Sequence, residues 1–95
     1  MRCFIVIVDD ATPAQQNAIT NYLQESAHGY WHRFTDLWLV ADPTDSLDTK
    51  QLRDRLRAVV PKAHMLIFRI DNPNAWSAFG KTGDFEWLKT EWNKK

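Results

Sequence analysis

Three short segments of this 95-residue chain are apolar on both of their alternating faces. They run from Cys3 to Val8, from Leu37 to Ala41 and from His64 to Ile70. Short runs of this kind, rich in β-branched residues, are typical of central strands with a cover on each side. A chain of this length hides roughly 60–70% of its unfolded surface, which is enough for one core. We therefore expect a single domain over residues 1–95, built around a sheet whose two faces both need a cover.

Two helices are predicted between these strands. The first begins at Thr12-Pro13-Ala14-Gln15, which combines an N-cap threonine, a proline at the first helical position and a glutamine three residues after the cap. The second begins after Ser46 or Asp48, either of which can cap it, and ends at Pro61. Both segments also carry apolar residues at helical spacing, so each should pack one face against the sheet.

The segments follow one another as strand, helix, two strands, helix and strand. The polar pair Thr35-Asp36 fits a tight hairpin between a strand at Tyr30–Phe34 and the apolar run that follows. This order predicts an α+β, ferredoxin-like βαββαβ fold with an antiparallel sheet. Right-handed crossovers then place two helices on one face of the sheet, with the strand order 4-1-3-2.

Residues 1–72 make up the predicted core, and residues 73–95 form a Trp-rich C-terminal helical extension. Phe85, Leu88 and Trp92 are spaced as one helical stripe. Because the two helices cover only one face of the sheet, the extension or a second subunit must cover the other. Tryptophan is also enriched in protein interfaces. We therefore expect a symmetric homodimer. Its predicted interface residues are Trp38, Phe68, Trp76 and Trp92.

Charge and composition narrow the function classes. Twelve basic and twelve acidic residues leave no strong overall field for nucleic acid or anionic lipid. Residues 1–49 hold two basic and seven acidic groups, whereas residues 50–95 hold ten basic and five acidic groups, a distribution that suits self-association. The lone Cys3 excludes a disulfide within the chain and a cysteine-based zinc site. The apolar run before Asp9 is too short for a signal peptide or a membrane span, so we expect a cytoplasmic protein without a membrane partner.

Asp9 is the sharpest candidate for catalysis, because it follows the first strand directly. A carboxylate in this place can bind Mg²⁺ or Mn²⁺, and two copies in a dimer could share one ion. The alternative is structural: Asp9 and Asp10 end the strand and favour the positive start of the next helix.

Lys50, Arg53 and Arg57 form a basic stripe along the second predicted helix. Such a stripe can follow a phosphate backbone, which keeps nucleic acid open as a partner. It can equally be an ordinary solvated helix face, since Asp54 lies within it.

Several aromatic motifs resemble those of the small bacterial family described as SinR-like. These motifs are Trp31-His32, Asp36-x-Trp38-Leu39-Val40, Gln51-Leu-Arg-Asp-Arg-Leu56, Ala75-Trp76-x-x-Phe79 with Gly80, and Trp87-Leu88-Lys89. That family is similar in fold to the CRISPR-associated small endoribonucleases and the VapD toxins. The resemblance implies a ferredoxin-like fold and a dimer formed through the sheet face. It also implies a metal at Asp9, because Val6-Ile-Val-Asp9 is similar to the strand-then-Asp pattern of the endoribonucleases.

Two functions from different classes are consistent with the sequence. The first is a non-catalytic dimeric interaction or accessory module of a defence or toxin–antitoxin system, with no firm cofactor. The alternative is a metal-dependent endonuclease that cuts RNA or DNA through Asp9 and needs Mg²⁺ or Mn²⁺.

Overall fold

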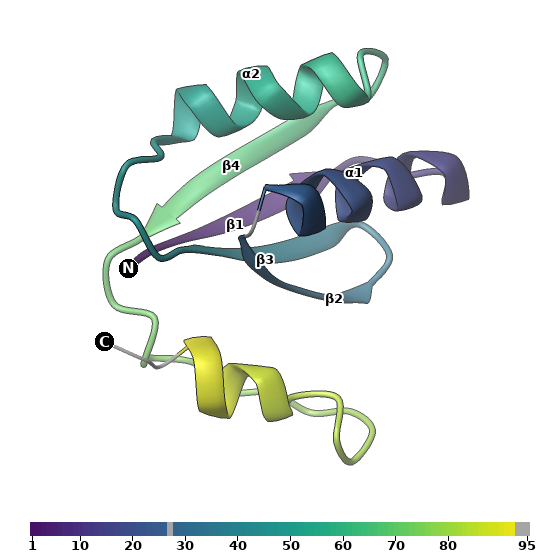
Figure 1. The fold of residues 1–95 in the computed structure, drawn as a ribbon. Helices are drawn as coiled ribbons and strands as arrows, with labels where there is room; N and C mark the ends of the chain where they lie inside the picture. The colour runs from purple at the N-terminus through teal and green to yellow at the C-terminus, as the bar shows by residue number, and fades with distance from the viewer. Residues whose placement is uncertain (27, 93–95) are drawn as a thin grey trace.

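The elements follow one another along the chain as strand, helix, two strands, helix and strand (Figure 1). The computed structural model describes residues 1–26 and 28–92. The fold is α+β with a four-stranded antiparallel sheet, which confirms the predicted class. The elements are β1 (Arg2–Val8), α1 (Pro13–Glu25), β2 (Gly29–Phe34), β3 (Leu37–Asp42), α2 (Thr49–Val59), β4 (Met65–Ile70) and a short π-helix (Leu88–Trp92).

Both α-helices begin with a capping box. In α1, the Thr12 side chain accepts a hydrogen bond from the Gln15 N–H at 3.1 Å, and the Gln15 side chain accepts one from the Thr12 N–H at 3.0 Å. Asp48 and Gln51 make the same reciprocal pair at the start of α2. Of the two predicted caps for α2, Asp48 is therefore the one used. These bonds satisfy N–H groups that lack partners within the first turn.

The sheet has the strand order β2-β3-β1-β4, and every neighbouring pair is antiparallel. This arrangement is compatible with the ferredoxin-like expectation. It places β2 and β4 at the two edges of the sheet. Among the described residues, no helix combines the length and the apolar character that crossing a membrane requires.

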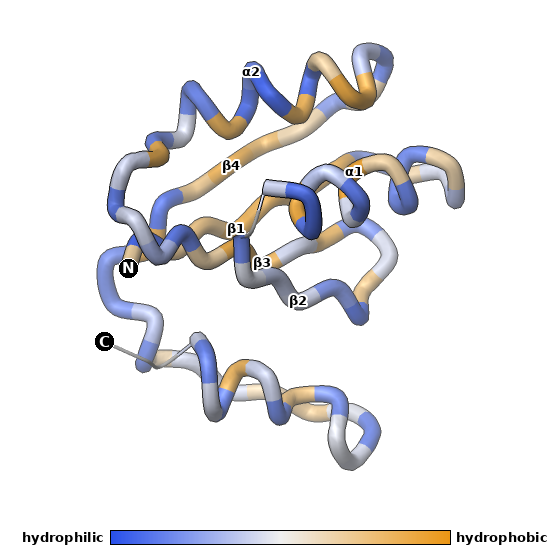
Figure 2. Tube along the Cα trace, in the orientation of Figure 1, coloured by the Kyte–Doolittle hydropathy of each residue, from blue (hydrophilic) through white to orange (hydrophobic). Residues whose placement is uncertain are grey.

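The larger core lies between the sheet and the two α-helices (Figure 2). Even-numbered residues of β1 face this side, because Phe4, Val6 and Val8 are fully buried there. The helices contribute a complementary set of buried side chains: Ile19, Leu23, Leu52 and Leu56.

Trp38 belongs to this core and not to an interface. It lies opposite Val6 in the ladder between β1 and β3 and is fully buried. Its Nε1 donates a hydrogen bond to the Thr20 hydroxyl at 3.3 Å, and its ring stacks on His32 with centroids 3.9 Å apart. The prediction that Trp38 contacts a second subunit is therefore wrong, because its side chain is already enclosed by its own helices.

The C-terminal segment folds back across the opposite face of the sheet (Figure 1). Its helical part covers residues 86–92, and the π-helical stretch Leu88–Trp92 within it buries Leu88 and Trp92. Phe85, the third member of the predicted stripe, is partly buried against the same cluster. The extension thus packs on the sheet of its own chain.

Candidate functional site

The sheet face opposite the α-helices is made of three rows of side chains that run across the four strands. The first row is Leu66, Ile7, Leu37 and Phe34. The second is Phe68, Ile5, Leu39 and Trp31, and the third is Ile70, Cys3, Ala41 and Gly29. Since side chains alternate between the two faces of a strand, these rows form one largely apolar surface.

The extension covers the third row and the β2–β3 half of the second. Leu88 and Trp92 pack there against Cys3, Trp31 and Leu39. The Trp31 Nε1 donates a hydrogen bond to the Asp84 carbonyl at 2.7 Å, and its ring stacks on Phe85. This link joins residues that are 53 positions apart and fixes the extension over β2.

The first row and one end of the second stay open to solvent. Leu66 is 55% exposed, Phe68 50%, Phe34 52% and Ile7 37%. We call these four side chains, together with the partly buried Leu37, the uncovered strip. It crosses all four strands beside the covered half of the face. A folded chain of this size thus presents a continuous apolar surface on an otherwise packed sheet.

A small cavity of about 280 Å³ continues the uncovered strip beneath the extension. Its walls are almost entirely apolar and include Phe34, Leu37 and Trp76. Phe79 lines the same cavity from the extension and is fully exposed. The exposed apolar surface therefore spans both the sheet and the extension.

The four side chains predicted to form an interface lie in three different environments. Trp38 is in the helix-side core, as described above. Trp92 is 3% exposed, and Trp76 is partly buried, so both pack within the chain. Phe68 alone of the four is half exposed on the sheet face, and it lies in the uncovered strip.

Asp9 is exposed in the turn that follows β1. Its N–H donates a hydrogen bond to the His64 carbonyl at 2.9 Å, and the next residue, Asp10, has a positive φ of 50°. The nearby Asp36 carboxylate accepts a hydrogen bond from the Ala11 N–H at 3.1 Å. Within residues 1–26 and 28–92, no three His, Cys, Asp or Glu side chains are grouped so that they could hold a metal ion. The structure thus places Asp9 at the end of β1, as expected, without assembling further ligands around it.

The basic stripe lies on the exposed face of α2. Lys50, Arg53 and Arg57 are all exposed. Arg53 donates from Nε and Nη2 to one carboxylate oxygen of Asp54, at 3.1 and 2.9 Å. These hydrogen bonds from Arg53, helped by its charge, lower the pKa of Asp54 from its ordinary value.

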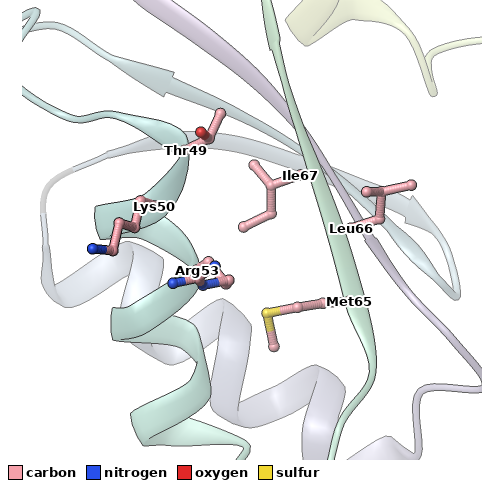
Figure 3. Close-up of a pocket in the computed structure, with 6 residues that line it drawn as sticks. All are labelled: Thr49, Lys50, Arg53, Met65, Leu66 and Ile67. Carbon is pink, nitrogen blue, oxygen red and sulfur yellow. The ribbon is translucent and has the colours of Figure 1, made fainter.

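Two members of the stripe line a pocket of about 330 Å³ between α2 and β4 (Figure 3). Lys50 and Arg53 stand on the α2 side of it, together with Thr49. Met65, Leu66 and Ile67 form the β4 side. Arg57 does not line the pocket, so the structure divides the predicted stripe between the pocket and the open helix face.

Asp42 is a buried carboxylate that the sequence analysis did not single out. It is 1% exposed and accepts hydrogen bonds from the Thr44 N–H and hydroxyl and from the Ser46 and Leu47 N–H groups, at 2.7–3.0 Å. Burial alone would raise its pKa, but these hydrogen bonds outweigh burial and lower the pKa from 3.8 to about 2. The pattern Asp-Pro-Thr-Asp-Ser, in which an aspartate precedes a run of turn residues, is the signal that could have indicated it.

The exposed part of the sheet face was also not predicted in detail. The sequence showed that one face needs a cover, but it did not show where the extension would end. Comparison with known proteins adds no further guide, since no protein-family model, no curated protein and no solved structure matches the chain.

Proposed function

We propose that the chain is a non-catalytic interaction module that works as a homodimer, with the uncovered strip as its self-association surface. The single observation that carries the proposal is the half-exposed state of Leu66, Phe68 and Phe34 on one sheet face. Surfaces of this kind on a small domain commonly mark protein interaction sites.

The size of the strip supports this proposal. The exposed parts of its aromatic and aliphatic side chains, with the neighbouring Phe79, present roughly 500 Å² of apolar surface per copy. A standard stable interface buries about 800 Å² per partner, and about 65% of the buried area is apolar in a homodimer. The exposed Asp9 lies just beyond Ile7, so a polar residue borders one end of the strip. In a two-fold dimer the strip would pack against its own copy.

The proposed cellular role follows the resemblance to the SinR-like family. We place the chain with accessory or regulatory proteins of a defence or toxin–antitoxin system, on a ferredoxin-like βαββαβ fold. The antiparallel sheet with two helices on one face supports that fold. No observation favours the endonuclease alternative, because Asp9 is exposed and no three potential metal ligands are grouped in the described part of the chain.

Light scattering on matched variants tests the proposed dimer. Phe68→Glu and Leu66→Glu each put a charge into the strip, and either should convert a dimer to a monomer because a buried unpaired charge is costly. Ala58→Glu is the control, since Ala58 is exposed on α2 and lies on the opposite side of the sheet from the strip.

All three variants should unfold cooperatively in a thermal melt, because the replaced side chains are at least half exposed or lie on an open helix face. The proposal expects a monomer for both strip variants and a dimer for Ala58→Glu. A dimer that persists in both strip variants would show that the interface lies elsewhere.

A further inference from the structure

The outer edge of β4 faces solvent and the pocket beside α2 instead of a fifth strand. Among the residues that the structure describes, strand β4 pairs only with β1 and ends the sheet. The hydrogen bond from the Asp9 N–H to the His64 carbonyl shows that His64 and Asp9 are a hydrogen-bonded pair at the start of this ladder. Because such pairs alternate along an antiparallel ladder, the backbone groups of Met65, Ile67 and Arg69 point away from β1. They form a ready template for another extended chain.

The pocket beside α2 follows this edge. Met65 and Ile67 pack toward the helix-side core, whereas Leu66 lies on the opposite face of the sheet. Figure 3 shows the Leu66 side chain pointing away from α2, whereas Met65 and Ile67 point toward it, so the residues that line the pocket come from both sides of β4. The pocket therefore follows the edge of β4, along which an added strand would run.

The two faces of such a strand would lie against different kinds of side chain, basic on one side and apolar on the other. On the α2 side, Lys50 and Arg53 line the pocket, and the helix as a whole carries four basic residues and one acidic residue. On the other side, the nearest side chains of β4 are Leu66 and Phe68, which are both about half exposed. Since side chains alternate along a strand, a matching segment would alternate acidic and apolar residues.

We propose that the edge of β4 binds an extended acidic segment of a partner protein as a fifth strand. Its backbone pairs with Met65, Ile67 and Arg69, its carboxylates face Lys50 and Arg53, and its apolar side chains lie beside Leu66 and Phe68. Main-chain hydrogen bonds would supply affinity, and the charged wall would supply specificity.

A second copy of this chain fits the same edge poorly. Two-fold pairing of β4 with β4 of another copy would place both α2 helices on the same side of the joined sheet, next to each other. The two basic helices would then repel, which disfavours this arrangement. The acidic segment has the opposite sign and meets no such cost. This site goes beyond the proposed homodimer, because its backbone pairing and its basic wall lie at the edge of the sheet and do not require the dimer to form. It shares Leu66 and Phe68 with the uncovered strip.

Binding of synthetic peptides to the full chain tests the proposal. The probe is a fluorescent peptide that alternates glutamate and valine, and its matched control alternates lysine and valine. By anisotropy, the glutamate peptide should bind at least about tenfold more tightly than the lysine peptide. Replacing a central glutamate–valine pair with two prolines should abolish binding, because one of the two residues supplies a ladder donor in either strand direction.

Charge-reversal variants locate the site. The double variant Lys50→Glu/Arg53→Glu should weaken binding of the glutamate peptide by about tenfold or more and strengthen binding of the lysine peptide. Arg33→Glu is the control, since it removes a basic residue on β2 at the opposite edge of the sheet. It should change the affinity less than about twofold. Acidic residues near the start of α2 favour the helix dipole, so the double variant should fold.

Three results would overturn the proposal. They are equal binding of the glutamate and lysine peptides to the wild-type chain, an equal loss in Arg33→Glu, and tight binding of the proline-containing peptide. Light scattering on the same samples reports the homodimer separately, so failure of either proposal can be recognised without the other.

Discussion

Asp42 shows how one side chain fixes the connection between β3 and α2. Its two carboxylate oxygens accept four hydrogen bonds from the loop that follows, and the loop in turn supplies the Leu47 carbonyl that accepts a hydrogen bond from Arg2. Leu47 itself is buried in the helix-side core. The carboxylate therefore holds the chain in the path that brings α2 over the sheet.

We predict that Asp42→Asn lowers the free energy of unfolding at pH 7 by about 2 kcal/mol, because an amide cannot accept all four hydrogen bonds. The folded-state pKa of about 2 lies below the ordinary value of 3.8. The wild-type carboxylate therefore stabilises the fold fully above about pH 4, and this contribution is lost as the pH falls toward about 2. Urea unfolding at several pH values measures both effects.

The matched control for this prediction is Asp71→Asn. Asp71 is 87% exposed and contacts Arg69 at 3.3 Å, so its replacement should cost less than about 1 kcal/mol. An equal loss of stability in the two variants would contradict the role given to Asp42. So would an Asp42→Asn protein that keeps the full acid sensitivity of the wild type between about pH 4 and 2.

For Asp9 we expect no catalytic role. It is exposed, and no three potential metal ligands are grouped among the described residues. The non-catalytic proposal predicts no cleavage of labelled RNA or DNA across a titration of Mg²⁺ or Mn²⁺. Wild type and Asp9→Asn should behave alike in gel assays. Cleavage that a chelator abolishes and that Asp9→Asn lacks would refute the proposal and establish the endonuclease alternative.

At the scale of elements, local signals predicted the start of α1 at Thr12 and narrowed the start of α2 to Ser46 or Asp48, of which the structure uses Asp48. The capping boxes at Thr12 and Asp48 each depend on residues three positions apart, so a sequence window contains the whole interaction. The side of the sheet that Trp38 faces could not be predicted from a local pattern in this way. It is set by the register that pairs Trp38 with Val6, residues 32 positions apart, and no local pattern specifies that register.

The sequence predicted that the extension packs as a structural element. It did not predict what the extension packs on or which type of helix it forms. Its aromatic residues indicated that it would pack on something, and the choice between its own sheet and a second subunit was open. The structure shows packing on its own sheet, through contacts such as Trp31 with Asp84 that span most of the chain. The expected regular helical stripe became a π-helical turn, which buries Leu88 and Trp92 together.

Leu88→Ala tests whether the extension supports the fold. Leu88 is 5% exposed in the cluster that includes Cys3 and Leu39, so we predict a loss of about 2–5 kcal/mol in the free energy of unfolding. Lys89→Ala is the control, because Lys89 is exposed and its ammonium lies 3.4 Å from the Glu86 carboxylate. It should change stability by less than about 0.5 kcal/mol. Urea unfolding that gives both variants wild-type stability would mean that the extension does not hold the sheet face.

At the scale of the whole molecule, the α+β class and its antiparallel sheet followed from the order of apolar segments. The need for a cover on the second face also followed, because strands with two apolar faces cannot be left bare. How far that cover reaches was not predictable, since it depends on where the chain crosses the sheet after β4. The uncovered strip is what remains beyond the reach of the extension, and it supports the proposed dimer.

The mass of the wild-type chain in solution tests the central claim most directly. Sedimentation equilibrium should give twice the mass of one chain at tens of micromolar, because the uncovered strip then lies against its counterpart on a second copy. A single-chain mass that persists throughout this concentration range would contradict the account. The strip would then be an exposed surface that the monomer tolerates, and the proposed homodimeric module would have to be abandoned.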